Sequence, residues 1–191
     1  MSTTRGTERR SRATVLRRHG VRALTAGAAL AGALMAVAGP AHATANVSVS
    51  GSVLQIDSDA ASDNVLVTQV GNRLVIRNDG GLLIPAAPCV ATAKNVSVCP
   101  AEGVTTIVAD LGDGDDRLEN RTLLRSRAVL GAGADQFVGG AGVDMAFGDV
   151  GNDRLAGNAG DDVLLGADGL DSAHGGDGVD KCDAEILTAC E

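Results

Sequence analysis

The sequence of 191 residues has no tryptophan and no tyrosine, and its two phenylalanines are Phe137 and Phe147. Aromatic side chains, which each bury roughly 150–250 Å² and dominate the energetics of most cores, are therefore almost absent. An interior built from this chain has to use small aliphatic side chains such as Leu155, Val163 and Leu164. A core of this kind is thin, so the fold needs a second source of stability.

Basic residues are concentrated in the first 43 residues, which hold seven arginines and a single acid, Glu8. An apolar run from Ala23 to Ala38 follows, and then the small-residue site Ala41-His42-Ala43. This order predicts a secretory signal peptide, residues 1–43, cleaved after Ala43. The run is shorter than the roughly 20 apolar residues that a transmembrane helix needs, so we expect no membrane span in the mature chain. The export route, general secretory or twin-arginine, stays open.

Without the leader, positive charge is scarce. Residues 44–191 carry 9 basic and 23 acidic residues, a net charge of −14. Because nucleic-acid binding depends on Lys and Arg that neutralise phosphates, this composition argues against a nucleic-acid partner. A chain this acidic is instead expected to bind cations.

What the sequence does contain is a tandem repeat from Leu130 to Asp183. Six nine-residue units follow one another in register: LGAGADQFV, GGAGVDMAF, GDVGNDRLA, GNAGDDVLL, GADGLDSAH and GGDGVDKCD. Each unit has Gly at its fourth place and Asp at its sixth, and most have an apolar residue at the eighth. This period with these residue types is typical of a parallel β-roll that binds calcium.

The spacing of the aspartates explains why a metal ion would be needed. If two units form one coil, residues eighteen apart stack at the strand spacing of about 4.8 Å. The sixth-place carboxylates then form two rows, one of Asp135, Asp153 and Asp171 and one of Asp144, Asp162 and Asp180. Like charges this close repel one another, so a cation has to bridge them. The alternative is that Gly and Asp serve only as metal-free turn formers.

Calcium suits such a site because it accepts six to eight oxygen ligands at flexible distances, whereas magnesium requires a stricter octahedron. The turn glycines permit the φ values that direct carbonyl oxygens inward. The candidate carbonyl ligands are Gly131, Gly133, Gly140, Gly142, Gly151, Gly160, Gly169, Gly176 and Gly178.

The units resemble the RTX nonapeptide of bacterial hemolysin-type calcium-binding proteins, G-G-x-G-x-D-x-apolar-x. This resemblance implies a secreted protein whose sixth-position aspartates bind several calcium ions through their side chains and whose turn residues bind them through carbonyls. The match departs from the pattern where Leu130 replaces the first Gly. It also departs where Asp149, Asn158 and Ala167 replace the second.

A seventh, detached unit precedes the repeat, from Leu111 to Leu118, and it places Asp116 in the sixth position. Leu111 and Leu130 are nineteen residues apart, one more than two units, which predicts a one-residue bulge. The polar segment from Asn120 to Ala128 between them is either a degenerate unit or a charge-balancing loop.

Residues 44–104 contain no nonapeptides but have a β pattern. The runs Val65 to Val70 and Arg73 to Asn78, joined by Gly71-Asn72, predict a hairpin. The stretch from Gly80 to Pro100 is rich in Pro and Ala, and we expect a loop there. Since the ends of a solenoid need covering, we interpret this region as a cap, with a binding face as the alternative.

Four cysteines follow the leader, which agrees with export. They permit three pairings, and the short loops favour Cys89 with Cys99 and Cys182 with Cys190. The second bridge would fold the tail, residues 184–191, over the open end of the roll.

Catalysis has little to build on. His174 is the one histidine after residue 43, so a Ser/His/Asp or Cys/His arrangement would have to use it. The repeated aspartates share one environment, whereas general acid chemistry needs two. We therefore expect no enzymatic activity.

The sequence thus predicts an all-β protein: a right-handed parallel β-roll, or solenoid, over residues 105–183 with an N-terminal β-rich cap. We expect a secreted calcium-binding protein whose folding depends on calcium. The alternative is an extracellular adhesive or structural module that holds a glycan or cell-surface partner and uses calcium only for its shape.

Overall fold

The computed structural model describes residues 43–190, and within them it contains strands and no helix, which confirms the all-β class. The predicted signal peptide lies outside the described residues except for Ala43. No helix in the described part of the chain has the length and apolar character needed to cross a membrane.

The strands of the N-terminal region are β1 (Ala43–Ser50), β2 (Val53–Ser58), β3 (Asn64–Val70), β4 (Arg73–Asn78), β5 (Gly81–Pro85), β6 (Val90–Ala93), β7 (Val96–Pro100) and β8 (Thr106–Asp110). Those that follow are β9 (Arg117–Arg121), β10 (Arg125–Gly133), β11 (Gln136–Val138), β12 (Asp144–Gly151), β13 (Arg154–Ala159), β14 (Val163–Asp168), β15 (Ser172–Asp177), β16 (Lys181–Asp183) and β17 (Ile186–Thr188).

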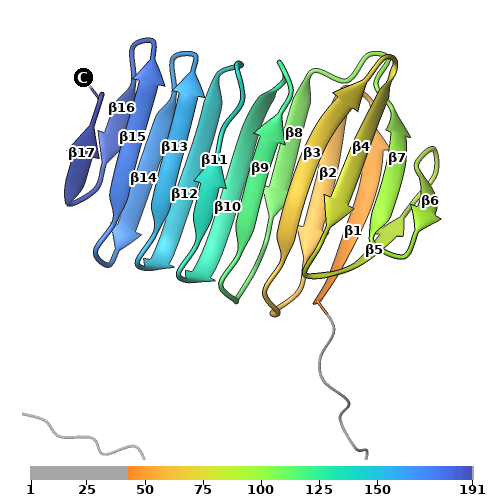
Figure 1. Cartoon of the computed structure of the whole chain (residues 1–191), viewed down its shortest axis with the longest axis horizontal. Helices are drawn as coiled ribbons and strands as arrows, with labels where there is room; N and C mark the ends of the chain where they lie inside the picture. Colours follow the sequence, from red (N-terminus) through yellow and green to blue (C-terminus); the bar gives the residue numbers. More distant parts are fainter. Residues whose placement is uncertain (1–42, 191) are drawn as a thin grey trace, which may run out of the picture. The chain divides into compact units, whose positions relative to one another are not determined.

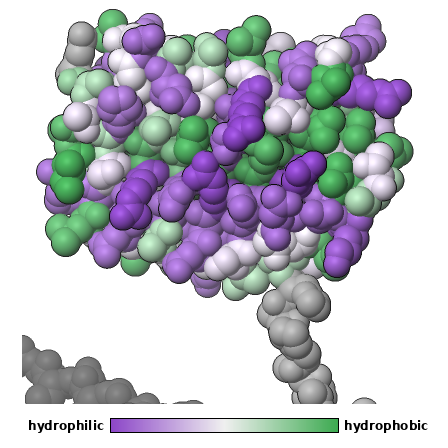
Figure 2. Space-filling model, in the orientation of Figure 1, coloured by the Kyte–Doolittle hydropathy of each residue, from purple (hydrophilic) through white to green (hydrophobic). Residues whose placement is uncertain are grey.

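These strands form two sheets that lie face to face (Figure 1). The first sheet has the order β16-β14-β12-β10-β8-β2-β1-β5, and the second has the order β17-β15-β13-β11-β9-β3-β4-β7-β6. From β8 onward the chain alternates between the two sheets strand by strand, so each pair of successive strands makes one coil. The outer face in view carries polar and apolar side chains interspersed (Figure 2).

The sheets are mixed. Every strand pair that involves β8 to β17 is parallel, but β1 with β2, β3 with β4, β4 with β7 and β6 with β7 are antiparallel. The hairpin predicted around Gly71-Asn72 is confirmed, since Val70 pairs with Arg73.

The prediction of a loop from Gly80 to Pro100 is wrong, because β5, β6 and β7 lie there. In β7 the usual alternation is reversed: Ser97 and Cys99 face the interior, while Val96 and Val98 stay partly exposed. A pattern of this kind does not indicate a strand from the sequence, and pairing with β4 forms one nonetheless.

The coil period is eighteen residues in most of the repeat. Ser126 pairs with Asp144, and Met145 pairs with Val163. Arg117, however, pairs with Gln136, nineteen residues later, so the predicted extra residue is confirmed and lies between Arg121 and Arg125. The segment from Asn120 to Ala128 is therefore a degenerate unit that takes part in the coil.

The core lies between the sheets and consists of the inward side chains. In the N-terminal region these are mostly branched or large, namely Val47, Leu54, Ile56, Val65, Val67, Leu74 and Ile76. In the repeat the eighth places point inward, and they hold both larger residues and alanines: Phe137, Ala146, Leu155, Leu164 and Ala173.

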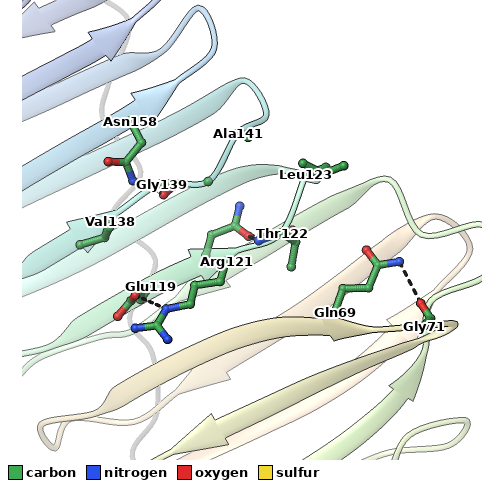
Figure 3. A pocket seen from close by; sticks show the side chains of 12 residues that line it. Gln69, Gly71, Glu119, Arg121, Thr122, Leu123, Val138, Gly139, Ala141 and Asn158 are labelled. Carbon is green, nitrogen blue, oxygen red and sulfur yellow. Dashed lines mark hydrogen bonds and ion pairs between the residues drawn. The ribbon is translucent and has the colours of Figure 1, made fainter.

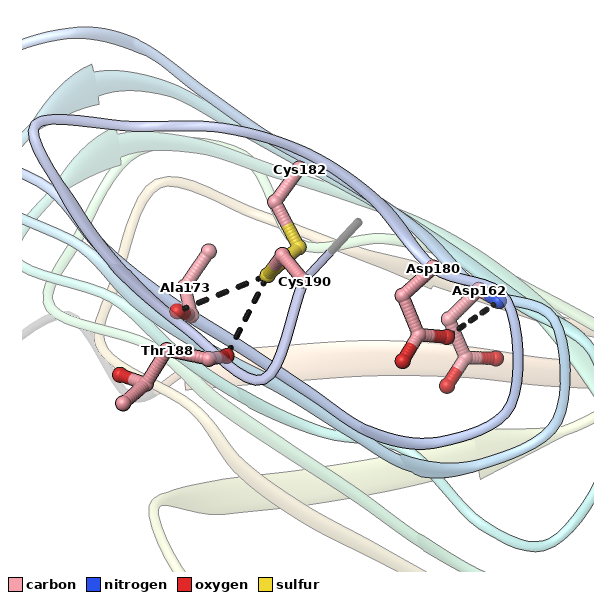
Figure 4. Close-up of a disulfide and its surroundings, with 6 residues drawn as sticks. All are labelled: Asp162, Ala173, Asp180, Cys182, Thr188 and Cys190. Atoms are coloured by element: carbon pink, nitrogen blue, oxygen red, sulfur yellow. Dashed lines mark hydrogen bonds between the residues drawn. A yellow bond between two sulfur atoms is a disulfide. The ribbon is translucent and has the colours of Figure 1, made fainter.

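Two disulfides join Cys89 to Cys99 and Cys182 to Cys190, as the short loops predict. Cys99 is buried in the core of the N-terminal region. The second disulfide lies inside the last coil, where Cys190 comes close to Ala173 and Thr188 (Figure 4). The tail before Cys190 forms β17, which continues the second sheet beside β15.

Candidate metal centre

The sixth-place aspartates stack in two rows, one on each bend of the coil. Except at Asp144, whose Oδ1 accepts the backbone N–H of Ser126, the Oδ1 of each carboxylate accepts the backbone N–H of the aspartate in the preceding coil. The distances are 2.9 Å from Asp135 N to Asp153 Oδ1 and 2.8 Å from Asp153 N to Asp171 Oδ1. In the other row they are 2.8 Å from Asp144 N to Asp162 Oδ1 and 2.9 Å from Asp162 N to Asp180 Oδ1, the latter pair drawn in Figure 4.

The first of these rows is longer than the sequence predicts. Asp116 N donates to Asp135 Oδ1 at 2.7 Å, and Asp63 N donates to Asp116 Oδ1 at 2.7 Å. We call Asp63, Asp116, Asp135, Asp153 and Asp171 the first row, and Asp144, Asp162 and Asp180 the second row. At the C-terminal end of the first row, Asp171 N donates to the carboxylate of Glu185 at 2.8 Å.

The row carboxylates are buried, and most of them have one oxygen without a partner. Every row aspartate is at most 2% exposed. Within residues 43–190 the buried side-chain oxygens that lack a hydrogen-bond partner are Ser97 Oγ and the Oδ2 atoms of Asp116, Asp135, Asp153, Asp162 and Asp171. An unpartnered buried oxygen costs roughly 1–3 kcal/mol, and more when it is charged. Five such oxygens therefore mark places in the two rows where the polypeptide supplies no hydrogen-bond donor.

Burial also disfavours ionisation of these groups. The pKa of Asp116 is raised to about 7, chiefly by burial and in part by the neighbouring charges of Asp135, Asp63 and Asp115, while a hydrogen bond from Asp63 N–H lowers it. Burial likewise raises the pKa of Asp135 and of Asp162 to about 6, with the next aspartates in their rows adding to the rise. The pKa of Asp153 is raised for the same reasons. A cation beside these carboxylates would favour their charged forms.

The unpartnered oxygens of Asp153, Asp162 and Asp171 each lie where a glycine leaves space because it has no side chain. A Cβ on Gly148 would overlap both Asp153 Oδ2 and the carbonyl oxygen of Gly166, and a Cβ on Gly157 would overlap both Asp162 Oδ2 and the carbonyl oxygen of Gly175. These are glycines at the first place of the unit. Because these glycines have no side chain, the carboxylate oxygen of their own unit and a carbonyl oxygen of the next coil can both lie close to the glycine Cα.

The glycines predicted as carbonyl ligands line the same turns, stacked coil upon coil. A Cβ on Gly151 would overlap Gly133 O, and one on Gly169 would overlap Gly151 O. The same close approach to the backbone of the preceding coil is found at Gly131, Gly140, Gly142, Gly160, Gly176 and Gly178.

Three units have a left-handed backbone at their second place although no glycine stands there. Asp149, Asn158 and Ala167, which replace glycine there, have φ of 81°, 72° and 78°. Asn and Asp tolerate this region, but alanine does so only with strain. The repeat therefore keeps its turn geometry where the glycine pattern is broken.

No three His, Cys, Asp or Glu side chains gather at one point within residues 43–190. A cation in the rows would thus receive one or two carboxylates and take its remaining ligands from backbone carbonyls. Hard oxygen donors of this mixed kind fit calcium and suit neither zinc nor copper.

Sequence reasoning missed three parts of this site. Asp63 was overlooked because its segment has no glycine turn, although Asp63-Asn64-Val65 repeats the Asp-x-apolar order of Asp116-Arg117-Leu118. Glu185 lies beyond the last unit. The third part is the set of first-place glycines, Gly139, Gly148, Gly157, Gly166 and Gly175, which belong to the pattern but were not assigned to the site. His174, the one candidate for histidine chemistry, is exposed in β15 and pairs with Ala156 of β13.

Comparison with known proteins agrees with this geometry. The family model described as RTX calcium-binding nonapeptide repeat (4 copies) matches residues 129–146 and 147–182. No curated protein and no solved structure matches the chain. The matched residues cover strands β12 to β15 and most of both carboxylate rows. Residues 129–182 of this chain therefore match the RTX calcium-binding nonapeptide repeat.

Proposed function

We propose that this chain is a secreted, non-enzymatic calcium-binding protein in which several calcium ions bind between stacked coils. In this proposal residues 105–183 form a right-handed parallel β-roll, residues 44–104 cap its first coil, and residues 184–191 close its far end. Cleavage after Ala43 releases the protein to the outside of the cell. The acidic net charge of residues 44–191 and the two disulfides support an extracellular setting.

The observation that carries the proposal is the set of five buried Oδ2 atoms without a partner, at Asp116, Asp135, Asp153, Asp162 and Asp171. At Asp153 and Asp162 this oxygen lies beside a carbonyl oxygen of the next coil, at a glycine with no side chain to fill the space. These oxygens, with Asp180 and the turn carbonyls, are the ligands that we assign. The protein contributes by holding them in place, since each Oδ1 is fixed by the backbone of the preceding coil.

The calcium ion would neutralise like charges between coils and would supply the partner that each Oδ2 lacks. Because the unfolded chain does not hold these oxygens together, binding free energy becomes folding free energy. The alanines at the inward eighth places, Ala146 and Ala173, leave this part of the core with little apolar surface to compensate. We therefore expect the repeat to lose its order when calcium is removed.

Titration calorimetry tests this function. The purified chain should bind calcium with dissociation constants of roughly 0.1 to 1 mM, the range of extracellular modules, and should bind magnesium more weakly. Asp153→Ala and Asp162→Ala, one from each row, should each weaken binding and lower the number of ions bound. Asp57→Ala, which removes an exposed carboxylate from β2, is the matched control and should bind calcium like the parent chain. A chain that binds no calcium under these conditions would overturn the proposal.

A further inference from the structure

The two carboxylate rows begin in the same unusual way. Asp63, the first member of the first row, has partners for both oxygens: Oδ1 accepts from the side-chain amide of Asn78, and Oδ2 accepts from the hydroxyl of Ser58. Asn78 is fully buried and is itself fixed, because its Oδ1 accepts the backbone N–H groups of Asn64 and Gly80, both at 3.0 Å. The row therefore starts at a carboxylate that the polypeptide satisfies completely.

Asp144, the first member of the second row, is satisfied in a similar manner. Its Oδ1 accepts the backbone N–H and the hydroxyl of Ser126, both at 2.7 Å, and its Oδ2 accepts the N–H of Gly140 at 2.7 Å. Burial raises the pKa of Asp144, and the side-chain amide of Asn120 is among the groups beside it that lower this pKa. Each row thus begins with an aspartate that accepts from a serine hydroxyl and has partners for both of its oxygens, with a buried asparagine nearby.

Asn120 is held in place by the loop that contains the extra residue of the coil. Its Nδ2 donates to Leu124 O at 2.9 Å, and its Oδ1 accepts from Thr122 N at 3.0 Å and from Thr122 Oγ1 at 2.7 Å. Figure 3 shows this loop, with Thr122 and Leu123, facing the turn of Gly139 and Ala141 in the next coil. The change of register from nineteen to eighteen residues therefore occurs where the amide is inserted.

The later members of each row lack such partners. Asp116, Asp135, Asp153 and Asp171 in the first row, and Asp162 in the second, each keep a buried Oδ2 with no partner within residues 43–190. An amide N–H and a calcium ion are alternatives at such an oxygen, because each gives a buried carboxylate a partner of positive character.

We propose that the polar groups at the start of each row, Ser58 and Asn78 beside Asp63 and Gly140 and Asn120 beside Asp144, are end caps that replace a calcium ion, so that Asp63 and Asp144 bind none. This inference rests on the calcium-binding function proposed above and defines where its sites begin. It makes the start of each row a template that is complete without metal. Calcium then orders the coils from this template toward the C terminus.

The number of calcium ions bound per chain tests the proposal. Asp144→Asn and Asp162→Asn make the same change in the same row, one at the capped member and one at an uncapped member. In calorimetry on the full chain with calcium alone, Asp162→Asn should lose one ion, whereas Asp144→Asn should bind as many ions as the parent. Asp63→Asn and Asp153→Asn should behave in the same contrasting way in the first row. If Asp144→Asn loses an ion just as Asp162→Asn does, the proposal is overturned.

A variant that is expected to bind an additional calcium ion provides a second test of the proposal. Asn120→Asp replaces the amide by a carboxylate, so the chain should bind one additional calcium ion and unfold at a lower temperature when calcium is absent. Asn72→Asp, in the exposed turn between β3 and β4, adds the same charge away from both rows and should change neither quantity. An Asn120→Asp chain that shows a native circular dichroism spectrum in calcium but binds no extra ion contradicts the proposal. If that variant does not fold, the comparison of Asp144→Asn with Asp162→Asn decides alone. If the parent chain binds no calcium, the proposed calcium-binding function itself fails. If the parent binds calcium but Asp144→Asn loses an ion, only the end-cap inference fails.

Discussion

The N-terminal region, residues 43–110, and the repeat, residues 111–183, share the same two sheets but are held together by different forces. The first buries branched side chains such as Ile56 and Ile76, each worth roughly 1.5–3 kcal/mol, and its one buried row carboxylate is fully hydrogen-bonded. The second buries alanines at Ala146 and Ala173, together with carboxylates whose Oδ2 atoms lack partners. From this comparison we propose that hydrophobic burial suffices in one region, whereas the other needs a cation to complete it.

The largest effect that we expect comes from replacing three carboxylates of the first row, which should make the repeat less dependent on calcium. In the triple variant Asp135→Asn, Asp153→Asn, Asp171→Asn, the new amides can donate where Oδ2 was unpartnered. The calcium-free chain should therefore become more stable. Calcium at 100 times its dissociation constant stabilises by about 2.7 kcal/mol per site, and that gain should disappear for the altered sites.

Thermal unfolding with and without calcium measures both changes. The control replaces three exposed carboxylates instead, Asp57, Asp79 and Asp110, and should retain the full calcium response. A triple variant in the first row that still gained as much stability from calcium as the parent would show that these side chains are not its ligands.

Much of this arrangement could be predicted from the sequence, because period nine dictates which aspartates stack and short loops favour both disulfides. Asn78 and Asn120 could not be found in this way. Asn78 meets Asp63 across the hairpin of β3 and β4, and Asn120 comes beside Asp144 only when two coils stack, so neither role follows from the repeat pattern. The strands between Gly80 and Pro100 could not be predicted for a related reason. The polar side chain of Ser97 faces inward because β7 pairs with β4, and the sequence of β7 alone does not indicate this.

The next largest effect should be that of pH on the stability of the calcium-free chain. The pKa of Asp116 is about 7, and that of Asp135 and of Asp162 about 6, above the roughly 3.9 of an unfolded aspartate. The folded, calcium-free chain thus binds protons that the unfolded chain releases. This contribution to stability is fully present below about pH 4 and is lost as the pH rises through about 6 to 7.

The metal-free chain should consequently unfold at a higher temperature near pH 5 than near pH 7.5, and calcium should stabilise it more at the higher pH. Scanning calorimetry at both values, with and without calcium, makes the measurement. Equal unfolding temperatures of the metal-free chain at the two pH values would contradict the account of the buried carboxylates.

The two disulfides separate the regions in a further way. Each closes a short loop, which the chain-entropy model values at about 2.5 kcal/mol. Replacing Cys89 and Cys99 by serine should destabilise the chain with or without calcium, since Cys99 belongs to the N-terminal core. Replacing Cys182 and Cys190 should lower the unfolding temperature chiefly in calcium, when the last coil is ordered. An equal loss in calcium-free solution for both variants would contradict this division.

The smallest effect concerns a single turn of the repeat. Ala167 has φ of 78°, and relief of this strain by Ala167→Gly should stabilise the calcium-loaded chain by about 1 kcal/mol. Ala159→Gly is the matched control in the repeat, where φ is not in the left-handed region, and it should destabilise by about 0.5 to 1 kcal/mol. Denaturant unfolding in saturating calcium compares the two variants. A loss of stability in both would mean that the turn at Ala167 carries no strain.

Hydrogen exchange followed by mass spectrometry tests most directly whether calcium holds the repeat together. With calcium present, the amides of β12 to β15 and those of β1 to β4 should both be protected. After chelation, protection should be lost across β12 to β15 and retained in β1 to β4, because only the former depend on a cation between their coils. Unchanged protection of β12 to β15 in excess chelator would contradict the account, since it would mean that the stacked carboxylates need no metal.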